Sequence, residues 1–209
     1  DKISISSNYY NQKCFELVLK LFKQYKFSGL INGPISKKHF LKNKYLGMTE
    51  YFAKKTKTKN YAMVIFNKKL SVSPITTHVP LKNVSKLISQ KKIVNHVSLI
   101  KRFYKKHFKK DVKIAITGLN PHCESNFINS EEEKIIKPAI KILKQRYRNI
   151  SGPYSADSIF IPINVKKFDL VVGMYHDQVL TPLKSKYSFD AINITLGLPF
   201  LRISPDHGP

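Results

Sequence analysis

Apolar residues recur along this chain in two alternating patterns, which predict strands and helices in turn. Short apolar runs bounded by turn residues, the pattern of buried strands, occupy residues 30–31, 61–66, 70–75, 112–117 and 170–174. Helical spacing or helix-start residues predict helices over residues 10–26, 36–43, 49–55, 84–90, 93–108 and 131–146. No internal repeat or low-complexity linker interrupts this alternation. We therefore expect an α/β fold with α/β/α layers and a largely parallel sheet.

A polar cluster interrupts the last of these apolar runs. Four polar residues follow position 174 directly: Tyr175, His176, Asp177 and Gln178. A core strand would not contain four such groups in succession, so the break predicts a functional site. Three hydrogen-bond donors lie further along, between short apolar runs, at Lys184, Asn193 and Arg202. The segment thus combines a candidate metal ligand, a carboxylate and donors that suit an anionic substrate.

Three histidines each follow the end of a predicted strand: His78, His122 and His176. Ligands of open α/β sheets bind beyond the carboxyl ends of the strands, so these side chains share one topological position. Three imidazoles with an open position suit a divalent ion such as Zn²⁺, acting as a Lewis acid on substrate oxygens. A hydrogen-bonded loop residue is the ordinary alternative for each one. Of the others, His207 stays open, and three are interpreted as surface or helix-face residues: His39, His96 and His107.

A proton acceptor would complete such a site. Metal coordination lowers the pKa of a secondary alcohol, so a nearby base can take its proton while hydride leaves the carbon. Asp177 and Lys184 are the candidates for this base, and Asp157, in a loop predicted at residues 152–157, is a third. A surface ion pair is the alternative for each. No glycine-rich G-x-G-x-x-G fingerprint is present, so the residues alone do not establish a nicotinamide cofactor.

The charge of the chain raises two classes of partner, neither of which we expect. The formal net charge is +24, which suggests nucleic acid or an anionic membrane. Only four of the 37 basic residues are arginines, however, and the lysines are spread over nearly every segment, which favours a solvated lysine-rich surface. Cys14 and Cys123 show no paired spacing, and no run is apolar enough for a membrane span. A reducing cytoplasm is therefore the expected location.

Eight short strings occur in the same order as the motifs of one enzyme family. They are NGPISK (32–37), GMTEYFA (47–53), TTHVPL (76–81), GLNPHCES (118–125), GPYSAD (152–157), MYHDQVLTPLK (174–184), NITLGLPFLR (193–202) and SPDHG (204–208). In this order they resemble the 4-hydroxythreonine-4-phosphate dehydrogenase family of pyridoxal phosphate biosynthesis. The match runs through almost the whole chain.

The resemblance implies a homodimer with a fold like that of the isocitrate and isopropylmalate dehydrogenases, and with its active site between two domains and two subunits. Residues 1–45 would be a remnant of the first domain, and residues 46–209 the second. A divalent metal, Zn²⁺, Co²⁺ or Mg²⁺, would bind histidines of both subunits: His78, His122 and His176. Substrate contacts would fall on Thr49, Lys184, Asn193 and Arg202. The implied reaction is NAD(P)-dependent oxidation of 4-phosphooxy-L-threonine, with decarboxylation to 3-amino-2-oxopropyl phosphate.

Two departures of the chain from the family pattern bear most directly on function. The family has histidine before the threonine of its GHTE motif, whereas this chain has Met48, which makes no strong hydrogen bond. The family's first strands, and the segment after DHG that helps to hold the nucleotide, are absent, so we expect a chain truncated at both ends. The alternatives are a paralogue that oxidises a phosphorylated D-threonate or tetronate, a catalytically impaired fragment, and a basic nucleic-acid-binding protein.

Overall fold

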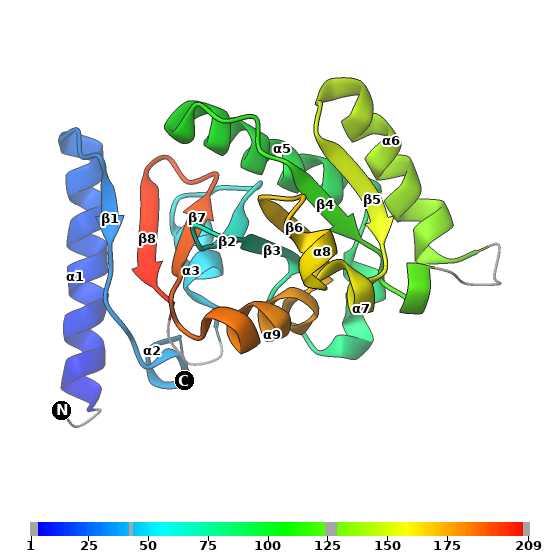
Figure 1. Cartoon of the computed structure of the whole chain (residues 1–209). Coiled ribbons are helices and arrows are strands. Elements are labelled where there is room, and N and C mark those ends of the chain that lie inside the picture. The colour runs from blue at the N-terminus through cyan, green and yellow to red at the C-terminus, as the bar shows by residue number, and fades with distance from the viewer. Residues whose placement is uncertain (1–3, 42–43, 124–128, 207–209) are drawn as a thin grey trace.

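The computed structural model describes residues 4–41, 44–123 and 129–206, in which eight strands form one sheet with helices on both faces (Figure 1). The strands are β1 (Gly29–Ile31), β2 (Ala62–Phe66), β3 (Ser71–Thr76), β4 (Ile114–Thr117), β5 (Ile150–Tyr154), β6 (Leu170–Tyr175), β7 (Ile192–Leu196) and β8 (Leu201–Pro205). The helices are α1 (Ile5–Gln24), α2 (Lys37–Leu41), α3 (Met48–Lys55), α4 (Val84–Leu87), α5 (Gln90–Phe108), α6 (Lys137–Arg146), α7 (Ala156–Ile159), α8 (Pro162–Val165) and α9 (His176–Tyr187). No helix in these ranges combines the length and apolar character of a membrane span.

The sheet is mixed, whereas the sequence predicted a largely parallel one. Its strands lie in the order β1-β8-β7-β2-β3-β6-β4-β5. β3, β6, β4 and β5 are parallel neighbours, but β2 is antiparallel to both β3 and β7, and β7 is antiparallel to β8. Only residues 67–70 join β2 to β3, and a link this short cannot make the crossover that a parallel pair needs. The carboxyl ends of β3, β6 and β4 consequently lie side by side at the same end of the strands.

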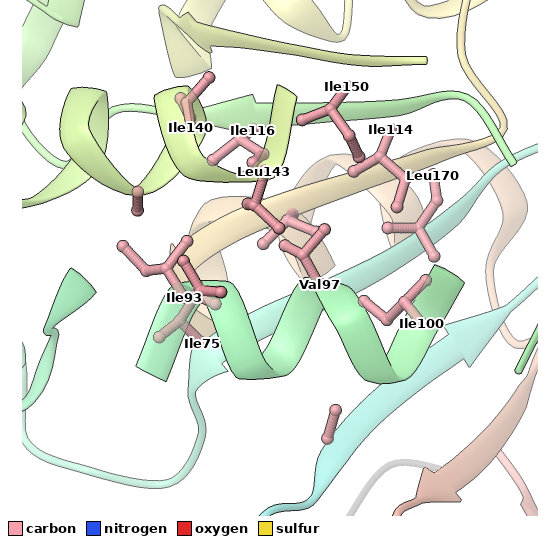
Figure 2. Close-up of a cluster of buried hydrophobic side chains, with 14 of the residues drawn as sticks. Ile75, Ile93, Val97, Ile100, Ile114, Ile116, Ile140, Leu143, Ile150 and Leu170 are labelled. Carbon is pink, nitrogen blue, oxygen red and sulfur yellow. The ribbon is translucent and has the colours of Figure 1, made fainter. Parts of the chain in front are cut away.

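Helices α5 and α6 cover one face of the sheet. The helix predicted over residues 93–108 is α5, whose Ile93, Val97 and Ile100 are buried with side chains of β4 and β6 (Figure 2), whereas Phe108 at its end is 45% exposed. Ile93 and Ile100 of α5, Ile114 of β4 and Leu170 of β6 have no exposed surface. Burial of each side chain of this size contributes about 1.5–3 kcal/mol relative to its exposure. This core fixes the strands whose ends carry the polar residues.

Helix α9 covers the opposite face. Its residues Val179 and Leu183 pack with Met63 and Ile65 of β2. The helix begins at the residue that follows β6, so three residues of the predicted polar cluster, His176, Asp177 and Gln178, form the first turn of α9, whereas Tyr175 ends the strand. His176 therefore lies at the carboxyl end of β6, because strand and helix meet there without a connecting loop.

Helices α1, α2 and α3 enclose an aromatic cluster beside β8. The ring of Phe15 lies edge-on to those of Tyr51 and Phe52, with centroids 5.9 and 5.3 Å apart. Phe200, just before β8, joins the same buried group. The helix predicted over residues 10–26 begins earlier, because Ser4 forms a capping box with the first turn of α1. This cluster sets α3 against the sheet.

One further prediction from the sequence is wrong, and another needs correction. Residues 152–154, predicted to lie in a loop, belong to strand β5 at the edge of the described sheet. Gly152 and Pro153 conceal this strand in the sequence, and an edge strand tolerates proline because one of its sides needs no hydrogen bonds. His96 lies on a helix face as expected, but that face is buried, and His96 Nε2 is 2.6 Å from Ser73 Oγ.

Candidate active site

A cavity of about 260 Å³ lies between α3, α9 and the face of the sheet formed by β2, β7 and β8. Six residues singled out from the sequence line it: Thr49, His78, His176, Lys184, Asn193 and Arg202. Three others singled out from the sequence are not among its lining residues: His122, Asp157 and Asp177. Side chains of a strand alternate between the two faces, which is why Asn193 of β7 and Arg202 of β8 reach the cavity from neighbouring strands.

Arg202 forms the buried cationic end of the cavity, with 2% of its surface exposed. Its Nε donates to Asn32 Oδ1 at 2.7 Å, and its guanidinium also donates to Thr195 Oγ1 at 3.3 Å. The guanidinium carbon lies 5.7 Å from the ring centroid of Phe52. Burial lowers the pKa of Arg202 to about 10, an effect that the Glu50 carboxylate partly offsets. The side chain stays charged at neutral pH and is held in one orientation.

Lys184 supplies a second cation. Its Nζ lies 3.2 Å from Asp206 Oδ1, and the side chains of Lys184 and Asp206 are 31% and 8% exposed. The Lys184 ammonium also lies 4.6 Å from the ring centroid of Phe189. Asp206 thus holds the ammonium of Lys184 at the wall of the cavity, which both residues line.

Two buried oxygens in the cavity wall, Asn193 Oδ1 and Asp206 Oδ2, have no hydrogen-bond partner among the described residues. Leaving a buried acceptor unsatisfied costs about 1–3 kcal/mol. An N–H or O–H group of a ligand would remove that cost. The cavity therefore offers cations to an anionic group and acceptors to a hydroxyl or ammonium group of the same small molecule.

His78 and His176 come together at the carboxyl ends of the adjacent parallel strands β3 and β6. Their ring centroids are 5.4 Å apart and the rings are inclined by 42°. His176 Nδ1 lies 2.7 Å from Asp177 Oδ1. A carboxylate in this position accepts the Nδ1 proton, which leaves Nε2 of His176 as the free ligand atom.

His122 lies apart from this pair. It is in the turn Pro121–Cys123 after β4, two strands away from β3 in the sheet. Its side chain is 73% exposed, and its Nδ1 lies 3.7 Å from Asp157 Oδ2. Within the described ranges, no three His, Cys, Asp or Glu side chains come together so as to hold a metal ion. One chain thus brings together His78 and His176 but not His122. His207, which the sequence analysis left open, lies outside the described residues.

Met48 and Thr49 begin helix α3 at the wall of the cavity. Thr49 Oγ1 lies 3.1 Å from Thr195 Oγ1, and both side chains are buried. Met48 is 6% exposed and belongs to the aromatic cluster around α3. Its thioether gives the wall an apolar surface where the motif resemblance leads to histidine, so this position supplies no strong hydrogen bond.

Gly47 allows a carboxylate to approach His78. Glu50 Oε1 accepts a hydrogen bond from Thr77 Oγ1 at 2.7 Å. A Cβ atom on Gly47 would lie 2.8 Å from Glu50 Oε2 and 2.8 Å from His78 Nδ1, closer than real Cβ contacts come. A side chain at position 47 would therefore displace the imidazole or the carboxylate.

The sequence did not single out three of the residues that shape the cavity: Asn32, Thr195 and Asp206. Asn32 and Asp206 stand in the strings NGPISK and SPDHG, so motif membership was a usable sign. Thr195 stands in the string NITLGLPFLR, but its contact with Arg202 depends on the pairing of β7 with β8.

The fold and the cavity together define an α/β protein with a cavity that is lined by two cationic side chains and reaches the carboxyl ends of the parallel strands β3 and β6. A profile of the family described as "Pyridoxal phosphate biosynthetic protein PdxA" matches residues 1–209. The chain belongs to this family, which confirms the resemblance inferred from its eight motifs.

Individual relatives agree with this assignment. The 4-hydroxythreonine-4-phosphate dehydrogenase of Sulfurihydrogenibium sp. (strain YO3AOP1) is 48% identical over 187 residues, which are 88% of this chain and 58% of the relative. The D-threonate 4-phosphate dehydrogenase of Pectobacterium atrosepticum is 32% identical over 199 residues, 94% of this chain and 61% of the relative. A crystal structure of 4-hydroxythreonine-4-phosphate dehydrogenase from Klebsiella pneumoniae aligns with a TM-score of 0.82 at 32% identity, covering 99% of this chain and 64% of that one. The chain thus spans less than two thirds of each.

Proposed function

We propose that this chain forms the substrate-binding and metal-binding part of a metal-dependent, NAD(P)-linked dehydrogenase. Its substrate would be 4-phosphooxy-L-threonine, oxidised with decarboxylation to 3-amino-2-oxopropyl phosphate in pyridoxal phosphate biosynthesis. The observation that carries this proposal is the cavity, in which Arg202 and Lys184 stand beside His78 and His176. The names of the relatives support the choice of substrate.

The substrate-binding roles follow from the chemistry of the lining. Arg202 and Lys184 provide charge-assisted hydrogen bonds to a phosphate group, each contributing about 1.5–3 kcal/mol. Thr49 adds a hydroxyl group to the same wall. The unsatisfied oxygens of Asn193 and Asp206 accept hydrogen bonds from the ammonium or hydroxyl groups of the substrate.

The donor set fits a divalent metal. Two imidazoles with their rings 5.4 Å apart are ligands that Zn²⁺ or Co²⁺ prefers, and Asp177 orients one of them. We propose that His122 of a second copy completes the set in a homodimer, which its 73% exposure and its absence from the lining of the cavity support. When bound, such a metal would lower the pKa of the substrate hydroxyl.

We assign the proton-transfer role to Lys184. Its Nζ lines the cavity next to the acidic partner Asp206. Asp177, whose side chain is 79% exposed and adjacent to His176, is the second candidate. Asp157 stands beside His122 and would enter the site together with that histidine from the other subunit, so it is the third.

We propose NAD or NADP as the oxidant for the full-length protein. The described residues contain no glycine-rich phosphate-binding loop, so we assign no residue to NAD or NADP and derive no step through it. We also propose a two-domain architecture like that of the isocitrate and isopropylmalate dehydrogenases, with residues 1–45 in the first domain and residues 46–209 in the second. A cytoplasmic location fits a biosynthetic enzyme with diffusible substrates.

A second candidate function is oxidation of D-threonate 4-phosphate. Two observations favour it: the 32% identical relative named for that activity, and Met48 in the cavity wall. D-threonate 4-phosphate carries a hydroxyl where 4-phosphooxy-L-threonine carries an ammonium group, and Asp206 Oδ2 could accept from either.

The test is the formation of NADH or NADPH by the full-length protein with each substrate, with Zn²⁺, Co²⁺ or Mg²⁺ or with a chelator. We expect metal-dependent turnover with the higher kcat/KM for 4-phosphooxy-L-threonine. A higher kcat/KM for D-threonate 4-phosphate would establish the second candidate instead. Absence of turnover by folded protein with both substrates and all three metals would contradict both candidates.

A further inference from the structure

A buried carboxylate holds the loop that carries His122, residues 118–123. Glu132, in the π-helical turn Glu132–Ile136 before α6, has no exposed surface. Its Oε1 accepts hydrogen bonds from Leu119 N and Asn120 N, both at 2.8 Å, and its Oε2 accepts one from Asn120 Nδ2 at 2.8 Å. Burial raises the pKa of Glu132, but these hydrogen bonds outweigh it and the pKa is lowered. An ionised carboxylate thus restrains the backbone just before His122.

Gln178 holds the same loop from the other side. Its Nε2 donates to Gly118 O at 2.8 Å, and its Oε1 accepts from Met174 N at 2.7 Å and from Thr117 Oγ1 at 2.9 Å. Gln178 is 8% exposed and stands in the first turn of α9, two residues after His176. One amide group therefore ties the end of β4 to the turn that presents His176.

The loop held in this way is strained. His122 and Cys123 have φ values of 58° and 56°, a region that residues other than glycine rarely adopt. Each such conformation costs about 1–3 kcal/mol and persists only where surrounding contacts enforce it. Glu132 and Gln178 provide those contacts, so the loop keeps a conformation that it would otherwise leave.

We propose that Glu132 and Gln178 are positioning residues that fix how each subunit presents His122 to the metal site of its partner. This inference rests on the proposed function, because it takes His122 as a metal ligand. Neither residue lines the cavity, so neither contacts the substrate. Their effect passes through the loop: Glu132 sets the amides before His122, and Gln178 sets the distance between the loop and the turn of His176.

Glu133 offers a matched control. It is next to Glu132 in sequence, but its side chain is 49% exposed and pairs with Lys137 on the surface. Replacing Glu133 removes the same charge from the same turn without touching the loop. Glu132→Gln is the conservative variant, since its amide oxygen can still accept from both Leu119 N and Asn120 N.

The experiment measures Co²⁺ affinity of the full-length protein by the visible absorption of the bound ion, and amide hydrogen exchange at Leu119 and Asn120. We expect E132A to weaken Co²⁺ binding by about 10–100-fold, the usual effect of losing a residue that orients a metal ligand. Exchange at both amides should accelerate in E132A. E132Q should retain most of the affinity, and E133A all of it. With saturating Co²⁺, KM for the substrate should stay near the wild-type value in every variant.

Wild-type Co²⁺ affinity in folded E132A with accelerated amide exchange would overturn this inference and leave the proposed function intact. Wild-type protein that binds no Co²⁺ would contradict the proposed function, and this inference with it. If E132A does not fold, E132D and Q178N test the same point, because both shorten the side chain that spans to the loop. Undiminished affinity in both would also overturn the inference.

Discussion

Lys184 Nζ lies 3.2 Å from Asp206 Oδ1 in the wall of the cavity, and the second carboxylate oxygen of Asp206 has no hydrogen-bond partner within the part of the chain that the structure describes. The pair thus places a cation beside an acceptor oxygen. One ligand could bind the cation through a phosphate group and the acceptor through an N–H or O–H group. Because Lys184 is about a third exposed, the pair contributes little to folding stability. We therefore expect the Lys184–Asp206 pair to affect ligand binding rather than folding.

Replacing Lys184 by alanine should lower kcat/KM by at least about 10-fold, because one charge-assisted hydrogen bond to the substrate phosphate is lost. Steady-state kinetics on the full-length protein measures this. Lys186 is the matched control, since it is exposed and lies on the same helix outside the cavity. Equal losses in K184A and K186A would mean that the effect is one of surface charge, contrary to the role assigned to Lys184.

Replacing Arg202 by lysine should weaken both binding and folding. The single ammonium group cannot replace the two directed bonds to Asn32 and Thr195, so a buried polar group is left unsatisfied. We expect a loss of about 1–3 kcal/mol in the free energy of unfolding, measured in urea, and a lower kcat/KM. The exposed Arg102 provides the control, and R102K should change neither quantity. A stable, fully active R202K would show that the guanidinium is not required.

His96 should make stability depend on pH. Burial, reinforced by the charge of Lys92, lowers the pKa of His96 to about 3, from 6.5 in an exposed state. Below pH 6.5 His96 binds a proton in the unfolded chain but not in the folded chain. The stability that is present above pH 6.5 is therefore lost as pH falls toward 3. At pH 5 the loss is about 2 kcal/mol. The difference in unfolding free energy between wild type and H96Q should shrink by about that amount from pH 7 to pH 5, and a constant difference would refute this.

Replacing Met48 by histidine should improve binding of a phosphorylated substrate. The new imidazole would add a hydrogen-bond donor to the cavity wall beside Thr49, which we expect to lower KM by about 10-fold. Comparison of KM for 4-phosphooxy-L-threonine and for D-threonate 4-phosphate shows whether the gain is specific to one substrate. An unchanged or raised KM for both would mean that position 48 does not face the bound phosphate ester.

The sequence predicted the central strands because they are continuous apolar runs, as in Leu170–Tyr175 of β6. It did not predict β5, whose Ser151, Gly152 and Pro153 give no apolar run. A turn at residues 67–69 between two strands is evident in the sequence and is confirmed, but the expectation of a largely parallel sheet did not allow for the antiparallel pairing of β2 with β3 and β7. Edge strands and hairpins depend on pairing, which an apolar pattern does not encode.

For the site, the rule that ligands bind beyond the carboxyl ends of strands led to both His78 and His176, which the structure brings together. The separation of His122 could not be predicted from strand order, because β4 is the direct neighbour of β6; it depends on the turn Pro121–Cys123, which leaves the His122 side chain 73% exposed. The unsatisfied oxygen of Asp206 could not be predicted either, because it depends on the contact between Asp206, which follows β8, and Lys184 of α9. Residue type and position along a strand are local properties, whereas an unsatisfied acceptor is a property of the folded chain.

The central claim is that the cavity holds both the substrate phosphate and the metal. The most direct measurement is a crystal structure of the full-length protein with 4-phosphooxy-L-threonine and Co²⁺, with the metal located by its anomalous scattering. We predict the phosphate within hydrogen-bonding distance of Arg202 and Lys184, and the metal bound by His78, His176 and the His122 of the other subunit. A phosphate outside this cavity, or a metal bound by other residues, would contradict the account.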